Sequence, residues 1–287
     1  MTETLTPFYM WAGGKSRLMQ RYLAVWPDMA QFDSYVEPFF GGGAVMCWVD
    51  SVRPDLPCVG NDVNKELVGL LRAVGDDVEG FLKSVSRLVS TYLKISGVQD
   101  RKVWYYQQRK KYWKDPTPAR LYVLMRLGFN GIWQTCADSN GLFGTPAGLL
   151  KHKTLEQVVD KPLVRAWAAK LSNVTMCDGS YEHTPIPPGK ALVYLDPPYR
   201  DSFTTYGTVF DDTEQKRLAE WYRELVEEGH TVILSNRCVE GDTFFEDLIG
   251  DIADFHYFDV TYTAGRRKKT ADGFEAKPAR ELLAISR

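Results

Sequence analysis

The spacing of apolar and polar positions divides the chain into three stretches. Short apolar runs bounded by Gly, Asn, Asp or Pro dominate both ends, and such runs are typical of buried strands in a parallel sheet. The run that begins at Tyr35 meets the glycine cluster 41–43 and then becomes helical, which predicts a strand, a tight turn and a helix. The other predicted strands are 56–60, 173–177, 191–195, 231–234, 255–262 and 281–285. Helical spacing follows Asn64, a residue type that caps helices, and recurs at 155–171 and 214–227.

The middle of the chain follows a helical pattern instead. Between about Asp76 and Gly128 no strand candidate occurs, and apolar residues recur on one helical stripe. The stripe consists of Val78, Phe81, Leu82, Val85, Leu88, Val89, Tyr92 and Leu93. Residues 129–148 are rich in Gly, Asn, Asp and Thr, which predicts a long exposed loop or hairpin.

Strands on both sides of a helical insert predict an α/β fold, in which a second, mainly helical domain interrupts a parallel-rich sheet. We expect the first part of the core at 1–64, the insert at 65–165 and the second part of the core at 166–287.

The composition is that of a folded protein. Of 287 residues 44% are hydrophobic, and 35 Lys and Arg stand against 37 Asp and Glu. No run of about 18 apolar residues occurs, and the amino terminus lacks a basic segment followed by an apolar one, so we expect a cytoplasmic protein without membrane contact. The five cysteines and four histidines are isolated from one another. This spacing supports neither a disulfide framework nor a metal site.

Two segments concentrate positive charge although the net charge is -2. Residues 101–114 carry six cationic and five aromatic side chains without an acidic one, and residues 266–269 read Arg-Arg-Lys-Lys. Basic residues interleaved with aromatic ones suit a phosphate backbone and exposed bases. The same pattern is equally typical of a solvated helix whose aromatic side chains pack inward, and a basic loop is equally often only solvated.

The most informative four residues are Asp196-Pro197-Pro198-Tyr199, directly after the apolar strand 191–195. Open α/β sheets bind ligands at the carboxyl ends of their strands. Two prolines lock the backbone and remove two N–H donors, so this corner offers acceptors and suits a substrate that carries an NH2 group. The Tyr199 ring can stack on a planar base. Taken alone, the tetrapeptide also fits a rigid turn with a solvated Asp.

Two glycine-rich segments accompany this corner. Trp11-Ala-Gly-Gly-Lys15 lies near the start, and Phe39-Phe-Gly41-Gly-Gly43 follows the first strand. Glycine turns let a ligand approach the backbone and open a helix amino terminus. Asp62 lies 21 residues after Gly41, close to the offset of about 20 at which an acidic side chain reaches a nucleoside ribose.

These three motifs, in this order, resemble those of the Dam-type (alpha-group) DNA adenine-N6 methyltransferases. Residues 8–64 and 173–210 match best, Leu234-Ser-Asn resembles a later core strand, and 280–285 resembles the final strand of the family. The resemblance implies a Rossmann-like S-adenosylmethionine-dependent sheet with an inserted, mainly helical target-recognition domain. It also implies double-stranded DNA as the partner and a target adenine that is flipped out of the duplex.

The resemblance further implies roles for individual residues. Trp11, Lys15, Phe39, Gly41, Gly43, Asp62, Asp178 and Asp196 would form the cofactor site, with Lys15 on the methionyl carboxylate, Asp62 on the ribose and Asp178 on the adenine. Asp178 also fits a turn or helix cap. Asp196, Pro197 and Tyr199 would be catalytic.

DNA contacts are expected from the insert and from the second basic segment. Arg101, Lys102, Arg109, Lys110 and Lys111 would contact phosphates, Asn130 and Gln134 would read base edges, and Arg266 and Arg267 would contact the backbone. The loop departs from members that recognise GATC, since it has Gln134, Thr135 and Cys136 and the segment 143–146. GATC is therefore not carried over as the target.

The electronics of the reactants predict how Asp196 acts. The lone pair of the adenine amine is conjugated with the ring, so activation must occur at the nitrogen. A carboxylate is too weak a base to deprotonate a neutral amine, so Asp196 and the Pro197 carbonyl would polarise and position it. The same rim would serve cytosine-N4, RNA adenine or a protein amide, and a DNA-binding relative without catalysis is a further alternative.

Overall fold

The computed structural model describes residues 5–200, 210–238, 241–262, 268–270, 273–275 and 277–287. Its centre is a seven-stranded sheet with the strand order β3-β2-β1-β4-β5-β9-β6. The strands are β1 (Ser34–Glu37), β2 (Cys58–Asp62), β3 (Val174–Asp178), β4 (Ala191–Leu195), β5 (Thr231–Cys238), β6 (Ala253–Tyr262) and β9 (Lys277–Ser286). Every strand predicted from apolar runs is present, and each bound shifts by only a few residues.

Six strands of this sheet run in one direction, and β9 runs in the opposite direction. β3, β2, β1, β4 and β5 pair in parallel, whereas β9 is antiparallel to both β5 and β6. The final segment of the chain thus lies between two strands that precede it. The sequence order reverses between β1 and β4, which makes their carboxyl ends the switch point where such sheets bind ligands.

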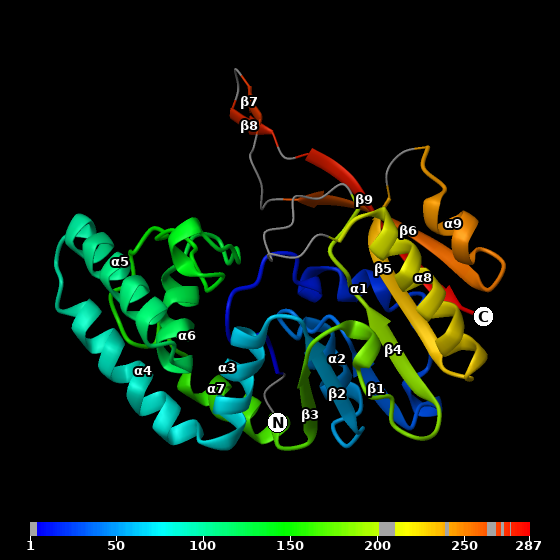
Figure 1. Ribbon diagram of the computed structural model, residues 1–287, viewed down its shortest axis with the longest axis horizontal. Coiled ribbons are helices and arrows are strands. Elements are labelled where there is room, and N and C mark those ends of the chain that lie inside the picture. Colours follow the sequence, from blue (N-terminus) through cyan, green and yellow to red (C-terminus); the bar gives the residue numbers. More distant parts are fainter. Residues whose placement is uncertain (1–4, 201–209, 239–240, 263–267, 271–272, 276) are drawn as a thin grey trace.

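Helices cover both faces of the sheet (Figure 1). On one face, α8 (Asp212–Glu227) and α9 (Phe244–Ile249) pack on β4 and β5 through a core that contains Val193, Leu218 and Tyr222. On the other, α1 (Met19–Tyr22), α2 (Ala44–Val52), α3 (Lys65–Asp76) and α7 (Lys161–Leu171) contribute to a larger core. That core continues into the helical insert, so the insert and the sheet share buried residues.

The insert contains α4 (Val78–Leu93), α5 (Val98–Lys114) and α6 (Pro118–Leu127), which stand beside the sheet (Figure 1). The helical pattern predicted for 76–128 is confirmed, and its breaks fall near Gly97 and Asp115. α3 packs against both α6 and α7. The boundaries 65 and 165 stay a prediction.

Local hydrogen bonds decide where two predicted helices begin. The Asn64 side chain accepts from the Leu67 N–H at 3.1 Å, as its capping position predicts. The helix expected from 155 begins instead at Lys161, because Asp160 caps it by accepting from Leu163 N–H and Pro162 occupies its first turn. The start at 155 was wrong.

Residues 129–148 form a loop as predicted, but it is not simply exposed. It contains a short helix, η3 (Ala137–Ser139), and a single bridge between Gly128 and Ala147. Trp133 and Phe143 are buried, because they pack into the core shared with the sheet. The segment 268–270 is also a strand, β7, paired with β8 (Gly273–Glu275), rather than a loop. Arg266 and Arg267 lie outside the described residues.

Candidate active site

The glycine segment after β1 forms a tight turn held by its neighbours. Gly41 and Gly43 have φ angles of +47° and +62°, which side chains other than glycine rarely adopt. A Cβ at Gly41 would lie 2.8 Å from Trp11 Nε1, and one at Gly43 would lie 2.7 Å from the Phe40 ring. Trp11 therefore packs directly on the turn, and glycine is needed at both positions to allow this close packing.

Asp62, at the end of β2, fastens this turn. Its carboxylate accepts the Gly41 N–H at 2.8 Å and the Asn64 N–H at 2.9 Å. Burial raises the pKa of Asp62 to about 6, although both hydrogen bonds oppose the rise. A carboxylate oxygen has more than one lone pair, so the group can accept from a further donor while it holds the turn.

Asp178 lies beside Asp62, since the two are register partners on β3 and β2. Its carboxylate pairs with Arg72 of α3 at 2.7 Å, and Arg72 also donates to the Met176 carbonyl. The pair is partly exposed, so its electrostatic contribution to stability is small. The structure therefore places Asp178 at the same edge of the sheet as Asp62, with its carboxylate paired to Arg72.

The Phe39 side chain points away from the glycine turn and packs against other aromatic side chains. Its ring stacks on Tyr181 with 5.1 Å between centroids and meets Phe210 edge-on at 5.9 Å. Phe39 is half-buried in this aromatic group, whereas the buried Phe40 underlies the glycine turn.

Asp196 follows β4 and meets Lys15, 181 residues away in the chain. Lys15 Nζ lies 2.6 Å from both carboxylate oxygens, and the two side chains are 4% and 20% exposed. Ser235 of β5 donates a further hydrogen bond to Asp196 Oδ1 at 2.8 Å. These contacts from Lys15 and Ser235 hold the Asp196 side chain in a fixed orientation.

The two prolines after Asp196 are anchored from α8 and β5. Gln215 donates from Nε2 to the Pro198 carbonyl at 2.7 Å, and Asn236 accepts the Arg200 N–H at 3.2 Å. Asn236 also donates to Gln215 Oε1. This network explains why the segment 196–200 has one conformation without belonging to a helix or strand.

Tyr199 lies next to Lys15 and is tied to the last strand. Lys15 Nζ lies 4.9 Å from the centre of the Tyr199 ring, and the Tyr199 hydroxyl donates to Glu281 Oε2 at 2.6 Å. Burial, with the Asp196 and Glu281 charges nearby, raises the pKa of Tyr199 well above its ordinary value. The phenol therefore stays protonated and acts as a donor.

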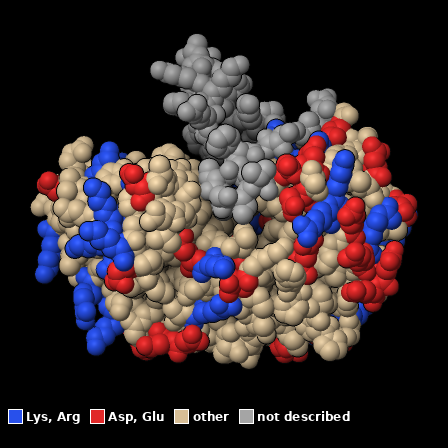
Figure 2. Space-filling view, viewed as in Figure 1, with Lys and Arg blue, Asp and Glu red and all other residues tan. Residues whose placement is uncertain are grey.

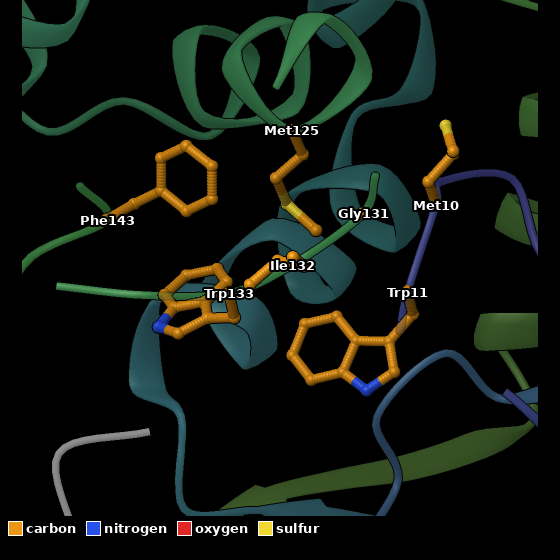
Figure 3. A pocket seen from close by; sticks show the side chains of 7 residues that line it. All are labelled: Met10, Trp11, Met125, Gly131, Ile132, Trp133 and Phe143. Carbon is orange, nitrogen blue, oxygen red and sulfur yellow. The ribbon is translucent and has the colours of Figure 1, made fainter. Parts of the chain in front are cut away.

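The loop 129–148 reaches the cofactor motifs through Trp11. The Ala12 N–H donates to the Gly131 carbonyl at 3.0 Å, and the Trp11 and Trp133 rings lie 5.9 Å apart. Figure 3 shows both indoles at a pocket that Met10, Met125, Ile132 and Phe143 also line. One tryptophan thus contacts the glycine turn on one side and the loop of the insert on the other.

Two of the arginines expected to contact phosphates instead make hydrogen bonds and ring contacts within the insert. Arg101 donates to the carbonyls of Ile95, Leu150 and His152 and stacks on the Tyr92 ring. Arg109 donates to the carbonyls of Gly144 and Thr145 and stacks on Tyr106 and Trp113. Arg109 thus holds the backbone of the loop 129–148, and Arg101 holds the backbone just after it and before α5. The expected phosphate contacts of Arg101 and Arg109 are therefore replaced by packing contacts. The aromatic residues of α5 pack inward, which was the alternative interpretation of residues 101–114.

The lysines of the same helix point outward. Lys102, Lys110, Lys111 and Lys114 are exposed, and Figure 2 shows cationic side chains along the outer edge of the helical unit. Asn130 is exposed at the start of the loop, with φ of +52°, and Gln134 is half-buried. The basic segment therefore separates into internal arginines and external lysines.

Several site residues were not foreseen from the sequence. Glu37, Ser235 and Glu281 are buried polar residues on β1, β5 and β9, and burial raises the pKa of Glu37 well above its ordinary value. The signal available was a polar residue inside an otherwise apolar strand. That signal becomes interpretable only when the strand's neighbours are known.

Over the ranges that the structure describes, no group of three or more His, Cys, Asp or Glu side chains is arranged to hold a metal ion. No helix within those ranges is long and apolar enough to cross a membrane.

Comparisons with known proteins agree with this geometry. The family model of the D12 class N6 adenine-specific DNA methyltransferases matches residues 11–265. The chain is 28% identical to the type II methyltransferase M.MjaIII of Methanocaldococcus jannaschii over 80% of this chain and 83% of that protein. It is 28% identical to the retron Ec67 DNA adenine methylase of Escherichia coli over 96% of this chain and 90% of that protein. It is 26% identical to the DNA adenine methylase of Haemophilus influenzae, over 97% and 93% of the two chains.

Proposed function

Because the chain belongs to the family of D12 class N6 adenine-specific DNA methyltransferases, we propose that it transfers a methyl group from S-adenosylmethionine to a flipped adenine in double-stranded DNA. The membership confirms the family expected from the three motifs. The observation that carries the assignment of residues is the corner 196–199, whose carboxylate and tyrosine meet Lys15 at the switch point of the sheet.

The residues present fit S-adenosylmethionine. The turn at Gly41 and Gly43 is packed against Trp11 and Phe40, which fixes its shape at the carboxyl end of β1. Asp62 offers acceptors for the ribose hydroxyls, and Lys15 is a cation that can pair with the methionyl carboxylate as well as with Asp196. When bound, the cofactor supplies an electrophilic methyl group.

The cofactor contact proposed for Asp62 predicts a pH dependence. Ribose hydroxyls donate to a carboxylate better than to a carboxylic acid, and the pKa of Asp62 is about 6. We expect S-adenosylhomocysteine to bind about tenfold more weakly at pH 5 than at pH 8, because about a tenth of the carboxylate is ionised one unit below its pKa. Calorimetric titration across this range measures it.

The contribution of Asp62 to the stability of the folded protein should change with pH in the opposite direction to the ligand affinity. A raised carboxyl pKa favours the folded state at low pH, so this contribution is present below the ordinary pKa and is lost as the pH rises through about 6.

The Asp62→Asn variant is the control for the ribose contact. It should bind S-adenosylhomocysteine weakly at every pH, without the pH dependence of the wild-type protein. Equal affinity of the wild-type protein at pH 5 and pH 8 would contradict the ribose contact.

Catalysis is assigned to the carboxylate and the proline corner. Asp196 and the Pro197 carbonyl accept the two amino hydrogens of adenine, which frees the nitrogen lone pair toward the methyl group. In-line transfer needs the reacting atoms about 3 to 3.5 Å apart, so positioning carries much of the rate. The proton leaves the nitrogen after transfer, when the product is cationic and a carboxylate is basic enough to accept it.

DNA contacts are assigned to the outward side of the insert. Exposed Lys102, Lys110 and Lys111 neutralise phosphates, while Asn130 and Gln134 of the loop face the base edges in the major groove. Arg109 supports this surface from inside by fixing the loop backbone at Gly144, and Arg101 fixes the segment that follows the loop at Leu150. Stacking on the Tyr199 ring stabilises the flipped base.

The experiment that tests the function follows the methyl group. The protein is incubated with methyl-labelled S-adenosylmethionine and either duplex plasmid DNA or RNA, and the nucleosides are separated after digestion. We expect the label in N6-methyladenine. Label in N4-methylcytosine, label transferred only to RNA, or no transfer would each reject the proposal.

A further inference from the structure

The last strand of the sheet carries a buried carboxylate that the proposed reaction does not use. Glu281 is 1% exposed and precedes three buried apolar residues of β9, Leu282, Leu283 and Ala284. A buried charge is costly unless it is hydrogen-bonded, so its place in a strand interior needs a compensating contact. The partners of Glu281 show what that contact is.

Two tyrosine hydroxyls donate to the same oxygen of Glu281. The Tyr199 hydroxyl lies 2.6 Å from Oε2, and the Tyr22 hydroxyl lies 3.1 Å from it. Tyr22 ends α1, the helix that follows the Lys15 segment, so the three residues come from distant parts of the chain. The Tyr22 contact limits how Glu281 can turn, and Glu281 in turn limits the tilt of the Tyr199 ring.

The ring so held borders the reacting groups. Lys15 contacts both the Tyr199 ring, at 4.9 Å from its centre, and the carboxylate of Asp196. A change in ring tilt therefore alters the surface on which a base stacks relative to the acceptor that polarises it. Methyl transfer is sensitive to such changes, since a misplacement of about 1 Å can lower the rate about a hundredfold.

We propose that Glu281 is a positioning residue for methyl transfer, which fixes the plane of the Tyr199 ring through its hydroxyl and so aligns the stacked base with Asp196. The inference rests on the proposed function, because the base stacks on Tyr199 only in that reaction. Glu281 itself touches neither the cofactor nor the base in this assignment.

The test compares Glu281→Ala, Glu281→Gln, Tyr199→Phe and the Glu281→Ala/Tyr199→Phe double variant in the plasmid methylation assay. Glu281→Ala and Tyr199→Phe should each lower kcat by about 10- to 100-fold, with the KM for DNA within about threefold of the wild-type value. Glu281→Gln should restore most of the rate, because its amide oxygen still accepts from Tyr199. The double variant should be no slower than the slower single variant, since both changes remove the same hydrogen bond between Tyr199 and Glu281.

A matched control separates positioning from stability. Tyr222→Phe also removes a buried tyrosine hydroxyl, which donates to the Val232 carbonyl on the opposite face of the sheet. It should lower the melting temperature without changing kcat. Additive losses in the double variant, or kcat of Glu281→Ala and Tyr199→Phe within twofold of the wild-type value, would overturn the proposal.

Two further results also have a defined consequence: a Glu281→Ala variant that does not fold, and a wild-type protein that is inactive. If Glu281→Ala does not fold, Tyr199→Phe and Glu281→Gln decide the matter, and full activity of Tyr199→Phe overturns the proposal. If the wild-type protein places no label on adenine, the proposed function itself is rejected. The wild-type protein is therefore measured before any variant.

Discussion

Replacing Asp196 with asparagine should lower the rate of methyl transfer by about a thousandfold while the affinity for duplex DNA stays within a few fold. The amide keeps the shape of the side chain but presents a donor NH2 group to the adenine amine and removes the charge. Loss of one hydrogen-bonding group that acts mainly in the transition state costs about 10²- to 10³-fold, and Asp196 also helps align the base. Single-turnover methylation and equilibrium DNA binding measure the two quantities.

The chain offers a control with nearly the same electrostatics. Asp50 pairs with Lys170 at 2.9 Å, and their side chains are 24% and 5% exposed, close to the values for Asp196 and Lys15. Asp50→Asn breaks an ion pair of equal burial that lies outside the site, so it reports the effect on stability alone. Turnover of Asp196→Asn comparable with that of Asp50→Asn would refute the polarising role.

Replacing Lys102, Lys110 and Lys111 with alanine should weaken DNA binding and flatten its salt dependence. Each phosphate contact contributes about 0.9 to the slope of log K against log salt, so the slope should fall by up to about 2.7. At about 0.1 M salt this corresponds to a loss of up to about two to three orders of magnitude in affinity if all three lysines contact phosphates. Titrations of labelled duplex at several salt concentrations measure the slope.

Two variants keep this prediction sharp. Lys216→Ala removes an exposed lysine of α8, on the helix that covers the sheet, and should leave the slope unchanged. Arg109→Ala should instead lower the melting temperature, because it frees the carbonyls of Gly144 and Thr145 from their donor. If the slope survives the triple lysine substitution, the exposed face of α5 is only a solvated surface.

The arginines and lysines of α5 have different environments, which the sequence pattern alone did not predict. The alternation of basic and aromatic residues predicted either a DNA-binding face or a helix with buried rings, and the structure shows buried rings together with exposed lysines in one helix. Trp104, Tyr105 and Tyr112 are buried, and the arginines beside them point back to the loop, while the lysines remain in solvent. An arginine can satisfy several carbonyls at once, whereas a lysine gains less from leaving water.

The sheet shows the same limit at the level of topology. Apolar runs predicted each strand, because burial on both faces requires continuous hydrophobic segments. The position of β9 between β5 and β6 was not foreseen, since strand pairing depends on residues far apart in the chain. That pairing is what brings Glu281 to Tyr199.

Local chemistry therefore determined much of this protein. The apolar runs, the cap at Asn64, the glycine turn and the rigid corner at Asp196 each depend on a few neighbouring residues, so the sequence alone determined the strands, the fold class and the motifs of the family. The meeting of Lys15 with Asp196, the burial of Glu281 and the inward turn of Arg101 were decided only by the tertiary structure. The physical reason is that these contacts join distant segments, and their free energy exists only after the shared core has formed and excluded water.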